Sequence, residues 1–142
     1  MHQPPQIPVM STYKEKLSIL SEMIAFAKID NKIGEPEYNF LLGVAIHLNV
    51  DQEIFDALFE NEAENVVLKS ETDRIIHFHR LVLLMNVDKK LLPIEINRIH
   101  NIGLDMGLPP AAIHKVLRLM HEYPDNVIPP KVLIDIFKAH YN

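Results

Sequence analysis

Four carboxylates recur in the chain at a spacing that could create a cation site. Asp30 precedes Glu37 by seven residues, and Asp88 precedes Glu95 by the same interval, with 58 positions between matching residues. Carboxylate oxygens are the ligands that hard cations such as Ca²⁺ or Mg²⁺ prefer. If the two segments meet across a pseudo-two-fold axis, Asp30, Glu37, Asp88 and Glu95 form a candidate metal site. Water molecules would complete the coordination shell of the ion.

The same carboxylates also have a structural interpretation. A loop aspartate accepts hydrogen bonds from free backbone N–H groups, and a glutamate in a first helical turn stabilises the helix dipole. Lys32 and Lys90 place positive charge inside both segments, which weakens cation binding. The segments are not EF-hands, because their twelfth positions hold Leu41 and Ile99 instead of glutamate. We favour capped helix corners over a metal site.

No catalytic or cofactor-binding residue is assigned from the sequence. The chain has no cysteine, its glycines form no phosphate-binding loop, and no serine lies in a G-x-S-x-G motif. His77 and His79 are two residues apart and diverge on a helix, so they cannot chelate together. Lone helical histidines are usually surface or partly buried residues, which is the interpretation we give them here.

Composition indicates one globular domain. The chain has 142 residues, 48% of them hydrophobic, and a formal net charge of -5. A negative charge argues against nucleic-acid binding, which requires a concentrated basic surface. We expect a flexible, proline-containing tail over residues 1–10 and a helical domain over 11–142. The chain shows neither a signal peptide nor an apolar stretch long enough to span a bilayer, so the expected location is cytoplasmic.

Apolar residues recur at helical spacing along most of the chain, and no segment alternates like a strand. The fold class expected is therefore all-α, a single-domain bundle of about seven helices. Helix-start signals are Pro36, Asp51, Ser70 or Thr72, Pro93, Pro109-Pro110 and Pro129-Pro130. Residues 60–70 form the linker, with a helical turn expected around Val66–Leu68.

The 58-residue offset extends beyond the carboxylates. Apolar character stays in phase on both sides of them, which predicts an internal pseudo-two-fold repeat: repeat one over about 13–60 and repeat two over about 70–122, followed by a C-terminal helix over about 129–140. The small residues Gly43 with Ala45, and Gly103 with Gly107, are expected to permit close helix packing or to end a helix.

A helix that ends in Ala27-Lys28-Ile29-Asp30-Asn31-Lys32-Ile33, with Glu37 opening the next helix, resembles the tellurite-resistance TerB-like family. The resemblance covers about residues 13–122, and the second copy retains Asp88, Leu91 and Glu95. It suggests a small stand-alone bacterial member of that family. The resemblance implies a compact helical domain with surface acidic residues, metal binding in some members, stress-response systems, protein partners and membrane-associated complexes.

Two functions remain open from the sequence. The first is a non-enzymatic TerB-like interaction module, related to the stress response, whose acidic patch binds a divalent cation weakly. The alternative is a metal-dependent hydrolase or phosphotransferase in which the four carboxylates hold the ion and its bound water is the nucleophile. A helix-turn-helix over Ile94–Met120 is a third idea, which the small number of cations disfavours.

Overall fold

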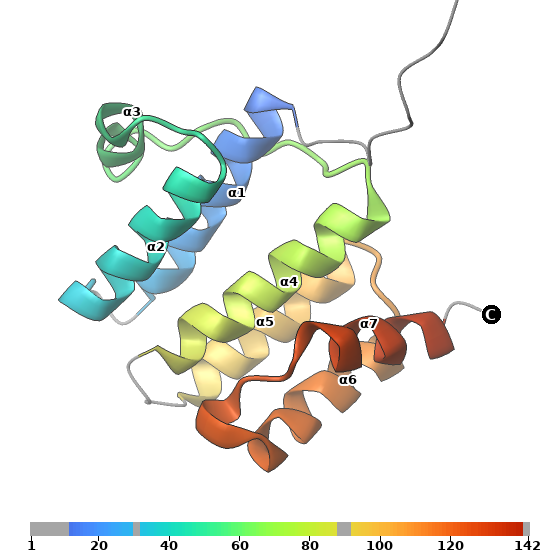
Figure 1. Cartoon of the computed structure of the whole chain (residues 1–142). Coiled ribbons are helices and arrows are strands. Elements are labelled where there is room, and N and C mark those ends of the chain that lie inside the picture. Colours follow the sequence, from blue (N-terminus) through green and yellow to red (C-terminus); the bar gives the residue numbers. More distant parts are fainter. Residues whose placement is uncertain (1–11, 30–31, 88–91, 141–142) are drawn as a thin grey trace, which may run out of the picture.

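The computed structural model describes residues 12–29, 32–87 and 92–140 (Figure 1). The described residues are all-α, with no strand, as the sequence predicts. No helix among them is both long and apolar enough to cross a membrane. The elements are α1 (Tyr13–Ala27), α2 (Glu35–His47), α3 (Gln52–Ala57), α4 (Glu71–Asn86), α5 (Pro93–Asp105), α6 (Pro110–Leu119) and α7 (Pro130–Ala139), with short 3-10 turns at Met120–Glu122 and Pro124–Asn126.

Helix α4 is the centre of the arrangement. It packs against α1 and α2 from the first half of the chain and against α5 and α7 from the second half. Figure 1 shows α1 and α2 side by side, α3 at the end of that pair, and α6 and α7 together beyond α4 and α5. The two halves of the chain therefore meet at α4.

The core is apolar and continuous through both halves. Phe78 and Phe137 meet edge to face at 5.9 Å, and Phe55 packs against Tyr38 and Phe59. Aromatic side chains bury more area than any others, so these rings contribute much of the hydrophobic stabilisation. Fully buried side chains come from α1, α2, α4, α5, α6 and α7, including Leu20, Met23, Leu41, Leu81, Met85, Ile99 and Ile113.

Side-chain caps fix the starts of α1 and α4. Thr12 Oγ1 accepts a hydrogen bond from the Glu15 N–H at 3.1 Å, and Glu15 Oε1 accepts one from the Thr12 N–H at 2.9 Å. Ser70 Oγ accepts from the Asp73 N–H at 3.3 Å, which confirms Ser70 as the cap of α4. Asp51 stands at the cap position of α3, but its side chain forms no capping hydrogen bond there, contrary to the prediction.

The first residues of the helices in the two halves of the chain are related by a constant offset in residue number. The helix starts Tyr13, Glu35 and Gln52 lie 58 positions before Glu71, Pro93 and Pro110. Asn49 after α2 and Gly107 after α5 are also 58 apart, and both have positive φ, 60° and 79°. Such a left-handed residue ends a helix and is most easily occupied by glycine or asparagine. The α2–α3 and α5–α6 connections therefore begin with the same left-handed backbone turn.

The segment after α3 is not helical, so the turn expected around Val66–Leu68 is absent. Residues 62–69, called the strap below, lie along α1 in a non-helical conformation. Side chains of α1 accept hydrogen bonds from every third strap N–H: Ser21 from Ala63 at 2.9 Å, Ser18 from Val66 at 2.9 Å, and Glu15 from Lys69 at 3.1 Å. These bonds replace the intrahelical bonds that a helical turn would need.

Candidate functional site

Two of the four predicted carboxylates are in the described residues, and each lies in the first turn of a helix. Glu37 in α2 is 8% exposed, and its Oε1 covers Gly34, where an added Cβ would lie only 2.8 Å from it. Glu95 in α5 accepts a hydrogen bond from the Leu92 N–H at 3.4 Å, as the helix-corner interpretation predicts. Asp30 and Asp88 lie outside the described residues.

No three His, Asp or Glu side chains within the described ranges are grouped so that they could hold a metal ion. A site that combines Glu37 and Glu95 with Asp30 and Asp88 would include residues outside those ranges. The Ca²⁺ or Mg²⁺ hypothesis therefore stays a prediction.

Among the described residues, the most buried ionisable side chain belongs to His77, which the sequence analysis interpreted as a surface or partly buried histidine. That interpretation is wrong for His77: it is 1% exposed, and its Nε2 lies 2.6 Å from Oε1 of Glu22 on α1. The Glu22 side chain is 33% exposed. A hydrogen bond to a charged group is stronger than one between neutral groups, so this contact stabilises the packing of α1 against α4.

A polar cavity of about 160 Å³ lies beside this pair, between α1, the strap, α4 and α5. Arg74 closes part of it, because its Nη1 donates to the Met106 carbonyl at 3.3 Å and its Nη2 to the Lys69 carbonyl at 3.1 Å. The other nitrogen of His77, Nδ1, is buried and has no hydrogen-bond partner among the described residues. The Glu22–His77 pair joins α1 to α4, and both residues line this cavity.

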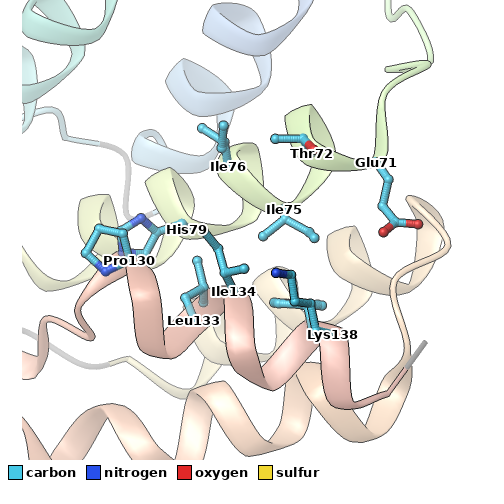
Figure 2. Close-up of a pocket in the computed structure, with 10 residues that line it drawn as sticks. Glu71, Thr72, Ile75, Ile76, His79, Pro130, Leu133, Ile134 and Lys138 are labelled. Atoms are coloured by element: carbon cyan, nitrogen blue, oxygen red, sulfur yellow. The ribbon is translucent and has the colours of Figure 1, made fainter. Parts of the chain in front are cut away.

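A concave site lies between α4 and α7. This α4–α7 groove has a volume of about 430 Å³ (Figure 2). Its walls are mainly apolar, and Ile76 and Ile134 at its rim are 39% and 44% exposed. The residues that line it are Glu71, Thr72, Ile75, Ile76, His79, Pro130, Leu133, Ile134, Phe137 and Lys138.

The polar side chains of the groove lie at its two ends. Figure 2 shows His79 and Pro130 at one end, Glu71 and Lys138 at the other, and Ile75, Leu133 and Ile134 between them. Burial lowers the pKa of His79, and a hydrogen bond with the Ile128 backbone opposes this only in part. The His79 ring is therefore neutral at pH 7.

One ring nitrogen of His79 has no hydrogen-bond partner in the part of the chain that the structure describes. Nε2 is buried and forms no hydrogen bond among the described residues.

Lys138 supplies positive charge at the opposite end. Its ammonium group turns toward Ile75 in Figure 2, while the carboxylate of Glu71 is directed away from it. Lys138 forms no ion pair within the described part of the chain. A cation beside an apolar wall favours a ligand that brings a negative charge to the same place.

Sequence reasoning missed this groove for an identifiable reason. The sequence predicts an apolar face of α7 with Val132, Leu133, Ile136 and Phe137. The structure buries the last three and leaves Val132 partly buried. Ile134 lies outside that predicted face, whereas Ile76, which the sequence places among the apolar positions of α4, is exposed in the structure. Ile134 was a usable signal, but only the helix packing shows that it borders one groove with Ile76.

The chain matches no family model, no curated protein and no solved structure.

Proposed function

We propose that this chain is a non-enzymatic interaction module that binds its partner in the α4–α7 groove. The observation that carries the proposal is the groove itself, about 430 Å³ with mainly apolar walls and polar groups confined to its ends. Binding pockets of proteins have volumes of roughly 300–1,000 Å³ and the same division between apolar walls and a few polar groups. Exposed Ile76 and Ile134 would gain hydrophobic stabilisation when a partner covers them.

The metal-dependent hydrolase suggested by the four carboxylates remains an untested alternative.

We further propose that the chain is an internally duplicated bundle. The matched starts of six helices and the paired left-handed residues Asn49 and Gly107 support this. The TerB-like resemblance, with the stress-response role and membrane-associated partners that it implies, stays a prediction.

The binding proposal can be tested with a neutral apolar probe, octan-1-ol, added to isotopically labelled protein in solution. We expect amide chemical shifts to change in α4 and α7, and affinity to fall at least about tenfold in I134E, because the new carboxylate opposes burial of the alkyl chain. V67E is the matched control, since Val67 on the strap is 81% exposed and lies outside the groove. Equal losses in both variants, or no shifts in α4 and α7, would contradict the proposal.

Cation binding has its own test. Titration of Ca²⁺ and Mg²⁺ into wild-type protein, and into a variant with D30N, E37Q, D88N and E95Q together, would compare binding heats directly. Weak binding that the four substitutions abolish would support the acidic patch. Identical heats would reject these four residues as ligands.

A further inference from the structure

The charged groups of the α4–α7 groove lie at one end of it. Lys138 lines that end with its ammonium group turned toward Ile75, whereas the Glu71 carboxylate is directed away (Figure 2). His79, at the opposite end, is neutral at pH 7 because burial lowers its pKa. Among the described residues that line the groove, Lys138 is therefore the one cation.

The charge of Lys138 is not neutralised by a carboxylate in the described part of the chain. Lys138 is exposed, and neither Glu71 nor Asp135, which lies one turn before it on α7, forms an ion pair with it. An anionic group placed beside the ammonium group would gain an electrostatic attraction that no described side chain now supplies. This end of the groove therefore favours a ligand with a negative head group.

The middle of the groove favours an alkyl chain. Its walls there are the side chains of Ile75, Ile76, Leu133 and Ile134, which offer no hydrogen bonds. The backbone N–H and C=O groups of a peptide would lose water at such walls without gaining partners, whereas a saturated hydrocarbon has no polar group to satisfy. A saturated chain therefore fits the middle of the groove better than a peptide does.

The size of the groove sets the length of that chain. From Glu71 to His79 the groove follows about two turns of α4, or roughly 12 Å. Its volume of about 430 Å³ is in the range of small-molecule sites. A straight chain of medium length, such as that of octanoate, lies within this span, and a much longer chain would leave the groove.

We propose that the α4–α7 groove binds an unbranched aliphatic carboxylate of medium chain length. The carboxylate lies beside Lys138, and the alkyl chain runs between α4 and α7 toward His79 and Pro130. This inference rests on the proposed binding function and specifies the chemistry of its ligand.

The test uses three probes that share an eight-carbon chain and differ in the charge of the head group: octanoate, octan-1-ol and octylammonium. Each is titrated into isotopically labelled protein at pH 7 and low salt, and dissociation constants are taken from the amide shifts of α4 and α7. The ratio of the two charged probes removes the contribution of the shared chain. Wild-type protein should bind octanoate about two- to fivefold more tightly than octylammonium, which is the range of an exposed ion pair.

Substitutions of Lys138 separate its charge from the rest of the groove. K138E should reverse the preference, and K138M should abolish it while leaving the affinity for octan-1-ol close to that of wild type. K131E is the matched control, because Lys131 is exposed on the same helix but does not line the groove. It changes the net charge as K138E does, yet it should keep the wild-type preference.

Chain length tests whether the hydrocarbon is buried. Hexanoate should bind more weakly than octanoate by about three- to fourfold for each methylene removed, because each methylene leaves contact with the apolar walls. A carboxylate held only by a surface lysine would bind equally well with either chain, which would contradict the inference.

Other outcomes would also overturn the inference. One is a preference between octanoate and octylammonium that is the same in K138E as in wild type, and another is octanoate binding without shifts in α4 and α7. Groove shifts produced only by raising the protein concentration would identify a second copy as the occupant. If octan-1-ol binds the groove but octanoate shows no preference that depends on Lys138, this inference fails and the proposed function stands.

Discussion

His77 on α4 and Glu22 on α1 are joined by a hydrogen bond of 2.6 Å between Nε2 and Oε1. The histidine is enclosed by the fold, while the carboxylate remains partly open to solvent. This arrangement lets the carboxylate keep some hydration while it orients the buried ring. The bond links the first half of the chain to the central helix.

Removal of either partner should therefore destabilise the protein. H77L and E22L should each cost about 1–3 kcal/mol, because each leaves a polar partner without its hydrogen bond. The double variant should cost less than the two single losses added together. Urea unfolding of the four proteins measures the coupling; strictly additive losses would show that the contact contributes nothing of its own.

The strap should loosen when its middle hydrogen bond is removed. S18A leaves the Val66 N–H, now bonded at 2.9 Å, without its acceptor. We expect a loss of about 1–3 kcal/mol and faster hydrogen exchange at the Val66 amide. N65A, which alters an exposed strap side chain, is the control and should leave that exchange rate unchanged.

Two helical glycines should respond oppositely to alanine. In G103A the added Cβ would lie 2.7 Å from Ile113 Cδ1 and 3.3 Å from Phe78 Cε1, both in the core, so overpacking should cost about 1–3 kcal/mol. In G43A the Cβ meets nothing within 4 Å, so better helix propensity should add about 0.5–1 kcal/mol. Thermal unfolding would show the difference; a stable G103A would mean that Ile113 repacks freely.

The burial of His79 should make stability depend on pH. Its pKa is below the ordinary value of 6.5 in the folded state, mainly because burial disfavours the charged ring. The unfolded chain therefore binds the proton more readily, and stability should fall as pH drops through 6.5 toward the folded pKa. H79Q cannot titrate, so its stability should change less over this interval in denaturant titrations at several pH values. The same decline in H79Q would assign the effect to another group.

The sequence was sufficient for the elements that depend on local signals. Ser70 and the prolines at 93, 110 and 130 mark helix starts that the structure confirms, because capping and a fixed φ act within one turn. Of the glycines expected to permit close packing or to end a helix, Gly103 packs against Ile113 and Gly107 follows the end of α5, whereas Gly43 faces open space.

The features that could not be predicted depend on distant partners. The strap resembles a helical turn in sequence, but its N–H groups bond to side chains of α1, about 40 to 50 residues away in the chain. His77 carries no sign of its burial until Glu22 is placed opposite it. The α4–α7 groove arises from the packing of two helices far apart in the sequence.

The most direct test of the groove as a binding site is an isotope-filtered NOE experiment with octan-1-ol. The account predicts intermolecular contacts between the alkyl chain and the methyl groups of Ile75, Leu133 and Ile134. Contacts confined to other exposed apolar side chains, such as Val67 or Ile46, or no contacts at all, would contradict it.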